Sequence, residues 1–250
     1  MKSLPLLIAA TALLATGACS KKSADTASGP GTASAGPVAP VSPPNGDWSQ
    51  YVTKSAAGGF VMGNPNADAK LIEFGSMSCP HCAAFEKEGV PTLIQNYVKT
   101  GKVSWEFRNF IRDSFDLSAA LIARCNGEKS FFGLTRGIYA SQPEWVAKLQ
   151  AVPQPEMEKV MQLPPAQQFT TIAKTAGFPE FAALRGVPAG KSATCLTNQA
   201  EIDKLVQMTS DATSQYNIPG TPGFVLNGSL IQDVATWELL EPKIKAAIKG

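Results

Sequence analysis

Two cysteines separated by two residues, Cys79 and Cys82, are the strongest candidates in this chain for a reactive site. They follow a short apolar run and open a segment with apolar residues at helical spacing. Cys79 should therefore lie at a helix N-terminus, where backbone N–H groups and the helix dipole stabilise a thiolate. Because Cys79 precedes the helix, we predict that it is the exposed nucleophile and that Cys82 faces inward as the resolving thiol.

The two residues between the cysteines, Pro80 and His81, favour the same chemistry. Proline suits the first turn of a helix, where its missing N–H group costs no hydrogen bond. His81 is the single histidine of the chain and can place a donor or a positive charge beside the thiolate. Its replacement by alanine is expected to raise the pKa of Cys79. Because a stabilised thiolate makes a disulfide easy to reduce, the pair is expected to oxidise other thiols.

Other uses of such a cysteine pair fit the sequence less well. A structural zinc site requires a second Cys-x-x-Cys or a histidine pair, and the sequence contains neither. Covalent haem attachment requires histidine directly after the second cysteine, where this chain has Ala83. An inert structural disulfide is the remaining alternative, although it would need neither a helix-start position nor a flanking histidine. No metal and no other cofactor is expected.

Strands and a helix are predicted around the cysteine pair. Residues 79–97 carry apolar side chains at helical spacing, so a helix is predicted to begin at the pair. Apolar and polar residues alternate between residues 103 and 110, which places Val103, Trp105 and Phe107 on one face of a strand. The three strands predicted in this part of the chain cover residues 60–65, 69–74 and 103–110.

The next part of the chain is predicted to be helical. Residues 116–181 are mostly of helical pattern and are interrupted by prolines. Residues 198–201, Asn-Gln-Ala-Glu, resemble a capping box that would open a further helix. That helix would place Ile202, Leu205 and Val206 on its apolar face.

The C-terminal part is predicted to be a hairpin followed by a helix. Asn227-Gly228 joins two short apolar runs, which is a strong signal for a β-hairpin. The last helix is expected to end near Ile248. Strands and helices in this order, interrupted by a long helical stretch, indicate an α/β core with a helical insertion.

The cysteine segment resembles a known family. The sequence LIEFGSMSCPHC, the distant Gly220-Thr221-Pro222 and the helical stretch between them are similar to the DsbA family of thioredoxin-fold oxidoreductases, over roughly residues 60–250. The CPHC sequence is the one associated with the oxidising members of that family. The resemblance implies a thioredoxin fold with an inserted helical domain. The expected boundaries are core residues 47–115 and 196–250 around an insertion of residues 116–195.

The resemblance also implies roles for residues outside the cysteine pair. Glu73 lies six residues before Cys79, where the family carries a buried acid that can shuttle a proton to and from the resolving cysteine. The alternative for Glu73 is a half-exposed strand glutamate. Thr221-Pro222 matches the family's loop with a cis-proline opposite the active cysteines. The backbone of Thr221 would then pair with an extended substrate peptide.

The N-terminus has the pattern of an export signal. Residues 4–14 are mostly apolar but too few to span a bilayer, and they suit the core of a signal peptide over residues 1–18. Thr16-Gly17-Ala18-Cys19 resembles a bacterial lipobox, so Cys19 is expected to carry a lipid anchor, mildly favouring the outer membrane. Simple cleavage that leaves Cys19 as a free thiol is the alternative. Residues 19–46 are rich in Ala, Ser, Gly, Pro and Thr and are expected to be a disordered tether.

Two further cysteines, Cys125 and Cys195, remain if Cys19 is lipidated. In an oxidising compartment such a pair tends to form a disulfide, and some DsbA relatives resemble this chain in having a second disulfide. Two buried free thiols are the alternative. The disulfide is expected to join the insertion to the thioredoxin core and to take no part in redox chemistry.

The sequence thus favours an exported thiol:disulfide oxidoreductase on the periplasmic side of the cell envelope. Its expected partners are reduced or unfolded client proteins, a membrane through the lipid anchor and, by family resemblance, a DsbB-like membrane re-oxidant. A disulfide isomerase or reductant kept reduced by a DsbD-like donor is one alternative, and a non-catalytic redox-sensing lipoprotein is another. The 250 residues carry a net charge of only +2, so nucleic-acid binding is not expected.

Overall fold

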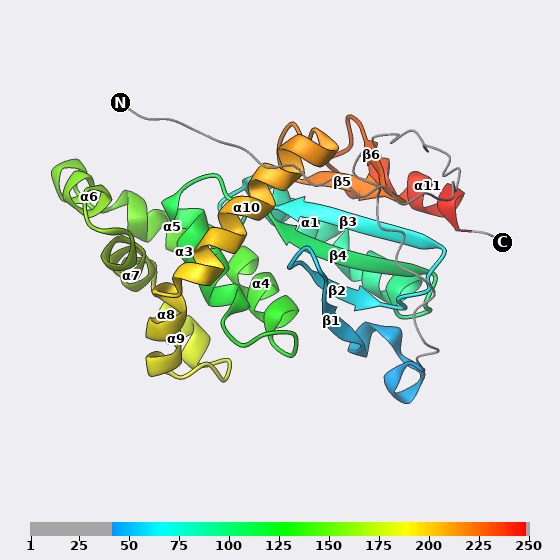
Figure 1. Ribbon diagram of the computed structural model, residues 1–250, viewed down its shortest axis with the longest axis horizontal. Helices are drawn as coiled ribbons and strands as arrows, with labels where there is room; N and C mark the ends of the chain where they lie inside the picture. Colours follow the sequence, from blue (N-terminus) through cyan, green and yellow to red (C-terminus); the bar gives the residue numbers. More distant parts are fainter. Residues whose placement is uncertain (1–41, 249–250) are drawn as a thin grey trace, which may run out of the picture. The chain divides into compact units, whose positions relative to one another are not determined.

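A six-stranded mixed sheet runs through the part of the computed structural model that is described, residues 42–248. The strands lie in the order β1-β2-β4-β3-β5-β6 (Figure 1), and β3 pairs with β4 in parallel while every other neighbouring pair is antiparallel. Their bounds are Val52–Lys54 for β1, Phe60–Gly63 for β2, Ala69–Gly75 for β3, Val103–Asn109 for β4, Gly223–Leu226 for β5 and Ser229–Ile231 for β6.

The N-terminal predictions fall mostly outside this range. The expected signal peptide, the lipidated Cys19 and residues 20–41 of the expected tether lie outside the described residues. The last residues of that stretch are described, and Pro44–Gly46 form a short 3-10 turn, η1, followed by η2 at Trp48–Gln50. None of the helices in residues 42–248 combines the length and the apolar character that crossing a membrane requires.

Side chains of the central strands alternate between two apolar layers. Leu71 of β3 packs in the larger core, whereas Phe74 of the same strand packs in a second cluster with Ala212 and Val225. This is the period-two alternation of a strand buried on both faces. Val103, Trp105 and Phe107 share the larger core, as predicted, but the side chains between them are also mostly buried.

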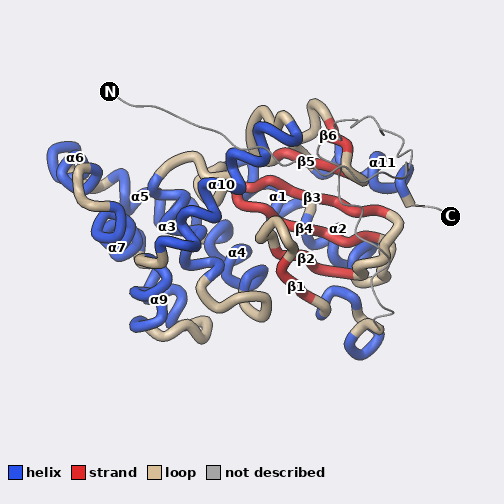
Figure 2. The backbone as a smooth tube through the Cα atoms, in the orientation of Figure 1, coloured by secondary structure: helices blue, strands red, loops and turns tan. Residues whose placement is uncertain are grey.

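Helices cover both faces of the sheet. In Figure 2 helix α10 (Gln199–Tyr216) crosses in front of the strands, while α1 (Pro80–Glu88) lies behind them. Helix α11 (Trp237–Ala247) lies on the same face as α1, because Trp237 is close to Gly89 and its ring lies 6.0 Å from that of Tyr97 in a tilted arrangement.

The single helix predicted over residues 79–97 is divided into three pieces. Helix α1 ends at Glu88, α2 spans Val90–Leu93, and η3, a π-helical turn, spans Ile94–Val98. The division falls two residues before Pro91, which lacks the N–H group needed to continue the hydrogen bonds of α1.

Two other local predictions also need correction, and one strand was missed. Val206 was expected on the apolar face of α10 but is 55% exposed, because that face is formed by Ile202, Leu205 and Met208. Only half of the predicted capping box is present: Asn198 accepts a hydrogen bond from the Glu201 backbone, but the Glu201 carboxylate binds Arg124 at 2.6 Å. Strand β1 was not predicted, since three residues at a sheet edge leave little periodicity.

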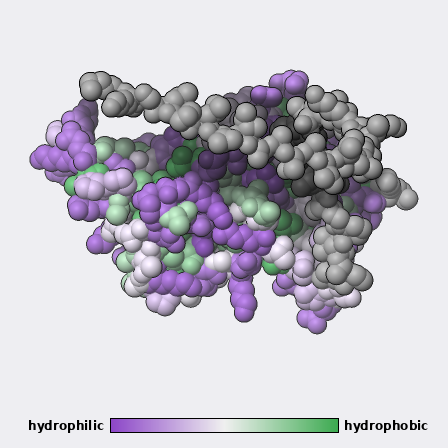
Figure 3. Space-filling model, in the orientation of Figure 1, coloured by the Kyte–Doolittle hydropathy of each residue, from purple (hydrophilic) through white to green (hydrophobic). Residues whose placement is uncertain are grey.

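Seven helices lie between β4 and α10. They are α3 (Ser114–Arg124), α4 (Phe131–Ala140), α5 (Gln142–Gln150), α6 (Gln154–Met161), α7 (Pro165–Ala176), α8 (Phe178–Ala183) and α9 (Ala189–Leu196). Prolines occupy the first turns of α5, α6, α7 and α8, where they start helices rather than interrupt them. On the face drawn in Figure 3 the surface of this helical part is largely hydrophilic, with small hydrophobic areas between. Phe60 of β2 stacks on Phe131 of α4 at 4.0 Å and so joins the helices to the sheet.

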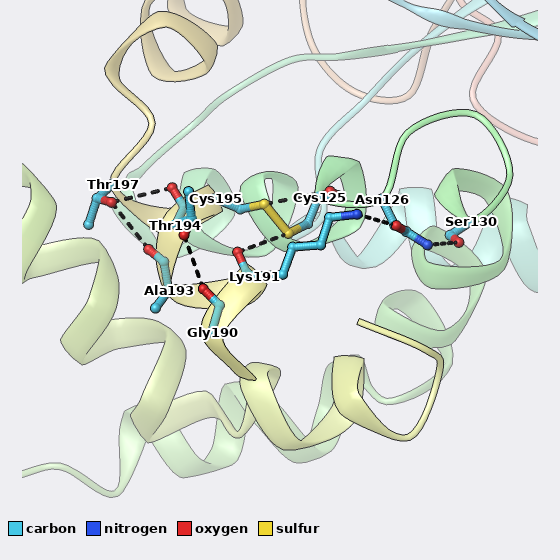
Figure 4. The surroundings of a disulfide bond; sticks show 9 residues. All are labelled: Cys125, Asn126, Ser130, Gly190, Lys191, Ala193, Thr194, Cys195 and Thr197. Carbon is cyan, nitrogen blue, oxygen red and sulfur yellow. Dashed lines mark hydrogen bonds between the residues drawn. A yellow bond between two sulfur atoms is a disulfide. The ribbon is translucent and has the colours of Figure 1, made fainter. Parts of the chain in front are cut away.

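A disulfide joins Cys125 and Cys195 (Figure 4), at the C-terminal end of α3 and within α9. Beside it, Lys191 donates a hydrogen bond to Asn126, which in turn donates to Ser130 at 2.8 Å. Because both cysteines lie in the helical stretch, the bond links two helices of the insertion. The expectation that it would join the insertion to the core was therefore wrong.

We expect the Cys125→Ser/Cys195→Ser double variant to lose about 2–4 kcal/mol of unfolding free energy, because the bond closes a long loop over a separation of 70 residues. Urea unfolding of both proteins measures the loss. The glutathione equilibrium of the Cys79–Cys82 pair should not change. An altered equilibrium would contradict a purely structural role for the second disulfide.

Candidate active site

Cys79 and Cys82 lie at the start of α1 as free thiols. Cys79 is the residue before the first helical turn, with extended backbone angles, and Pro80 occupies that turn. The predicted exposure of Cys79 is wrong: the residue is 3% exposed and Cys82 is fully buried. The reason is the loop before β5, whose Thr221 carbonyl accepts a hydrogen bond from the Cys79 thiol at 3.3 Å.

Several donors converge on the Cys79 sulfur. A hydrogen bond from the Cys82 thiol is the largest influence, and the Thr221 side chain and the backbone N–H groups of His81 and Cys82 act in the same direction. Together they lower the pKa of Cys79 to about 5, although partial burial opposes the shift. Cys79 is therefore a thiolate at neutral pH when the pair is reduced.

The contribution of His81 comes from its backbone. Its imidazole is exposed, and among residues 42–248 no hydrogen bond to that ring is present, whereas its main-chain N–H group faces the Cys79 sulfur. The sequence suggested that the imidazole would supply the donor or charge. In the structure, the start of α1 supplies the donors instead, because amides of a first helical turn have no partners within the helix.

Cys82 has the opposite environment. Burial is the main cause that raises its pKa well above the ordinary value, and its hydrogen bond to Cys79 adds to the effect. The pair therefore consists of one stabilised thiolate and one neutral thiol that serves as its donor.

A buried carboxyl, Glu73 of β3, lies near the pair. It is 1% exposed, which excludes the alternative of a half-exposed strand glutamate. Its only described hydrogen bond comes from the Trp105 indole at 3.0 Å. Burial, with the charge of Glu86, raises the pKa of Glu73 well above its usual range. Glu73 also contributes to raising the pKa of Cys82, so the two groups are electrostatically coupled.

Glu86 of α1 is a second buried carboxyl, and it forms an ion pair with Arg136, whose side chain reaches the surface. Burial raises the pKa of its carboxyl to about 7, and Arg136 of α4 opposes the shift through an ion pair of 3.2 Å. The Arg136 side chain is half-exposed. Glu73 of β3 and Glu86 in the last turn of α1 are therefore two buried carboxyl groups with raised pKa values, and the charge of Glu86 acts on Glu73.

The Thr221-Pro222 peptide bond is cis, and these residues lie next to Cys79. They line a cavity of about 480 Å³ with the segment around Leu230 and Val234. A second cavity, of about 500 Å³, begins at Ser78 and is lined by Phe115 and Trp145 of the insertion. The second cavity therefore adjoins the cysteine segment directly at Ser78, and the first is connected to it through Thr221, whose carbonyl contacts Cys79.

Sequence reasoning did not identify the residues that hold the turn before Cys79. They come from the insertion and include Asp116, Tyr139 and Gln142. Acidic residues at positions 113 and 116, just before an apolar run, were a visible signal for a helix N-terminus. That signal does not reveal that the Asp116 carboxylate points toward the cysteine segment.

Comparisons with known proteins place the fold. A family model described as Thioredoxin matches residues 55–246. The crystal structure of a protein-disulfide isomerase from Novosphingobium aromaticivorans is 35% identical with a TM-score of 0.72, covering 76% of this chain and 97% of that one. Alpha-DsbA1 of Wolbachia pipientis has the same fold, with 20% identity, a TM-score of 0.63 and coverage of 78% and 93%.

A curated relative from Rickettsia felis, described as a putative protein-disulfide oxidoreductase, is 29% identical over 170 residues. The match covers 68% of this chain and 53% of that protein. The chain therefore spans about half the length of the rickettsial relatives that it matches.

We expect Glu73→Gln to increase stability at high pH. The unfolded glutamate ionises near 4.5, whereas the folded group ionises far higher. Between these values the unfolded chain binds fewer protons than the folded one, so the wild-type free energy of unfolding falls as pH rises. Glutamine removes this loss and can still accept from Trp105. Urea unfolding should give similar stabilities below pH 4.5 and a gap that widens toward pH 8; a constant gap would contradict the shifted pKa.

We expect Cys82→Ala to raise the pKa of Cys79 by at least about one unit, because it removes the largest stabilising hydrogen bond. Thiolate absorbance during a pH titration measures the shift. Cys82→Ser is the matched variant: its hydroxyl can donate as the thiol does, so it should stay nearer the wild-type value.

The His81→Ala variant separates the contribution of the imidazole ring to the Cys79 pKa from that of the backbone N–H groups. The sequence favoured a rise in the Cys79 pKa in this variant, and the backbone donors limit that rise to less than the Cys82→Ala shift. A larger shift in His81→Ala would assign the stabilisation to the imidazole.

Proposed function

This chain belongs to the thioredoxin family, and on that premise we propose that it is an exported, DsbA-type thiol:disulfide oxidoreductase. It donates the Cys79–Cys82 disulfide to folding client proteins. The observation that carries this proposal is the asymmetry of the two sulfurs: donors converge on Cys79 and bring its pKa to about 5, while burial raises that of Cys82. A pair whose reduced form is stabilised in this way oxidises other thiols.

The reaction proceeds in two exchanges. A client thiolate attacks the Cys79 sulfur, the bond between the two cysteines breaks, and Cys82 leaves with the electron pair. A second client thiolate then attacks the client sulfur of the mixed disulfide and releases Cys79 as its stabilised thiolate. The client thereby loses two electrons and gains a disulfide, and the cysteine pair is reduced.

Glu73 has the environment of a proton donor for this reaction. The departing Cys82 sulfur needs a proton because burial holds its pKa well above the ordinary value. Burial raises the pKa of Glu73 well above its usual range and so favours the protonated carboxyl, which can supply this proton. In re-oxidation the same carboxylate takes the proton back.

Thr221 and Pro222 are the proposed contact for the client. The Thr221 carbonyl already approaches the Cys79 sulfur, and the neighbouring cavity offers space beside it. An extended client segment would pair with the Thr221 backbone in the manner of an added strand and bring its cysteine to Cys79.

The expected cellular setting completes the proposal. Export by the N-terminal signal and lipidation of Cys19 would hold the enzyme on the periplasmic side of the envelope. A DsbB-like membrane protein would accept the two electrons and restore the disulfide.

A disulfide isomerase is the second candidate. It is favoured by the description of the Novosphingobium protein, which is 35% identical to this chain. The same sulfur chemistry would then run from the reduced pair, with the Cys79 thiolate attacking incorrect client disulfides, and a DsbD-like donor would keep the pair reduced.

We expect the oxidised protein to form disulfides in a reduced, unfolded client, and Cys79→Ser to abolish this activity, because the nucleophilic sulfur is lost. Counting free client thiols over time measures the reaction. The Cys125→Ser/Cys195→Ser variant serves as the control, since it keeps the Cys79–Cys82 pair.

The direction of transfer is decided by two further measurements. An oxidant should be more stable to urea when reduced than when oxidised and should have a potential above about −180 mV. Greater stability of the oxidised form, with activity only on scrambled clients, would favour the isomerase. Failure to act on any client would favour a redox-sensing protein.

A further inference from the structure

The turn that presents Cys79, residues 76–79, is held from outside the thioredoxin core. The turn is closed by a hydrogen bond from the Cys79 N–H group to the Ser76 carbonyl at 3.1 Å. Tyr139 of α4 donates to the same carbonyl at 3.1 Å, and Gln142 of α5 donates to the carbonyls of Met77 and Cys79 at 2.8 and 3.0 Å. The insertion therefore contacts the backbone throughout this turn.

One of these contacts is a carboxylate. Asp116 of α3 is fully buried. Its Oδ2 accepts from the Ser76 hydroxyl at 2.7 Å and from the Arg112 backbone at 3.0 Å, and its Oδ1 accepts from the Met77 backbone at 2.7 Å. No salt bridge involves Asp116 among residues 42–248.

Helix capping does not account for this carboxylate. The start of α3 is capped by Asp113, whose side chain accepts from the Asp116 N–H group at 2.7 Å. The Asp116 side chain is thus free to point away from its own helix. A buried carboxyl without a cationic partner is costly, and burial raises the pKa of Asp116 to about 7. Stability alone would not favour such a group at this position.

Ser76 connects Asp116 to both sulfurs. Its hydroxyl donates to Asp116, its carbonyl accepts the Cys79 N–H group, and its backbone lowers the pKa of Cys82 against the effect of burial. A shift of Ser76 would therefore change the position of both cysteines and the angle at which the Cys82 thiol meets Cys79.

We propose that Asp116 is a positioning residue for the redox pair: through Ser76 and Met77 it fixes the turn so that the Cys79 sulfur faces its stabilising donors. The role rests on the proposed function, because the property it sets is the ease of reducing the Cys79–Cys82 disulfide. Asp116 touches neither sulfur and acts only through the turn.

The experiment measures the Cys79 pKa by thiolate absorbance and the equilibrium of the pair with glutathione. In Asp116→Ala the pKa should rise, and the equilibrium constant for reduction by glutathione should fall about tenfold, or about 30 mV. Asp116→Asn should lie between this variant and the wild type. Its amide can still accept from Met77 and donate to the Ser76 hydroxyl, but it cannot also accept from Arg112.

Ser76→Ala tests the route. If Asp116 acts through Ser76, the Ser76→Ala/Asp116→Ala double variant should shift the equilibrium by less than the sum of the two single shifts. Additive shifts would show that the two side chains act independently and would overturn the proposed connection.

Ser118→Ala is the matched control. Ser118 is buried on the same helix and donates to the Ser114 carbonyl at 2.7 Å, away from the turn. It should lose stability without changing the Cys79 pKa. Equal shifts of the Cys79 pKa in Ser118→Ala and Asp116→Ala would overturn the proposal. So would folded Asp116 and Ser76 variants whose Cys79 pKa and glutathione equilibrium equal those of the wild type.

The test of Asp116 can be distinguished from the test of the proposed function. If Asp116→Ala does not fold, Asp116→Asn and Ser76→Ala carry the test. Wild-type protein that fails to oxidise clients would contradict the proposed function, while the thiolate titration would still decide whether Asp116 positions Cys79.

Discussion

The Cys79 thiolate is stabilised by donors that must all face one sulfur atom. They come from the first turn of α1 and from the Thr221 side chain in the loop before β5, and these two segments are separated by about 140 residues in the chain. Hydrogen bonds weaken steeply when they are misaligned. The sheet and the helices packed on it therefore have to hold two distant segments in register, and most features of the site follow from this requirement.

The sheet provides one half of that support. Strand β3 ends directly before the cysteine turn and pairs with both β4 and β5, so the Thr221 loop and α1 are both anchored on it. Phe85 of α1 packs on Phe224 of β5 at 4.8 Å, which fixes the helix relative to the same strand. The two segments that meet at Cys79 are thus tied to one strand.

The insertion provides the other half. Its α3, α4 and α5 supply Asp116, Tyr139 and Gln142 to the turn, and its disulfide joins α3 to α9.

Three buried carboxyl groups with raised pKa values, Glu73, Glu86 and Asp116, lie around the pair. Each of them lowers the free energy of unfolding at neutral pH. Functional sites often retain such groups although they reduce stability.

The elements and the chemistry that depend on local patterns can be predicted from the amino-acid sequence. Alternation gave the faces of β4, Asn227-Gly228 gave the β5–β6 hairpin, and the cysteine spacing with Pro80 gave the helix start, because backbone preferences act over a few residues. Burial and long-range partners, in contrast, depend on the tertiary fold. It covered Cys79 with Thr221, turned Glu201 to Arg124 and directed Asp116 to Ser76. These outcomes depend on which distant segments the topology brings together, and no local pattern records that.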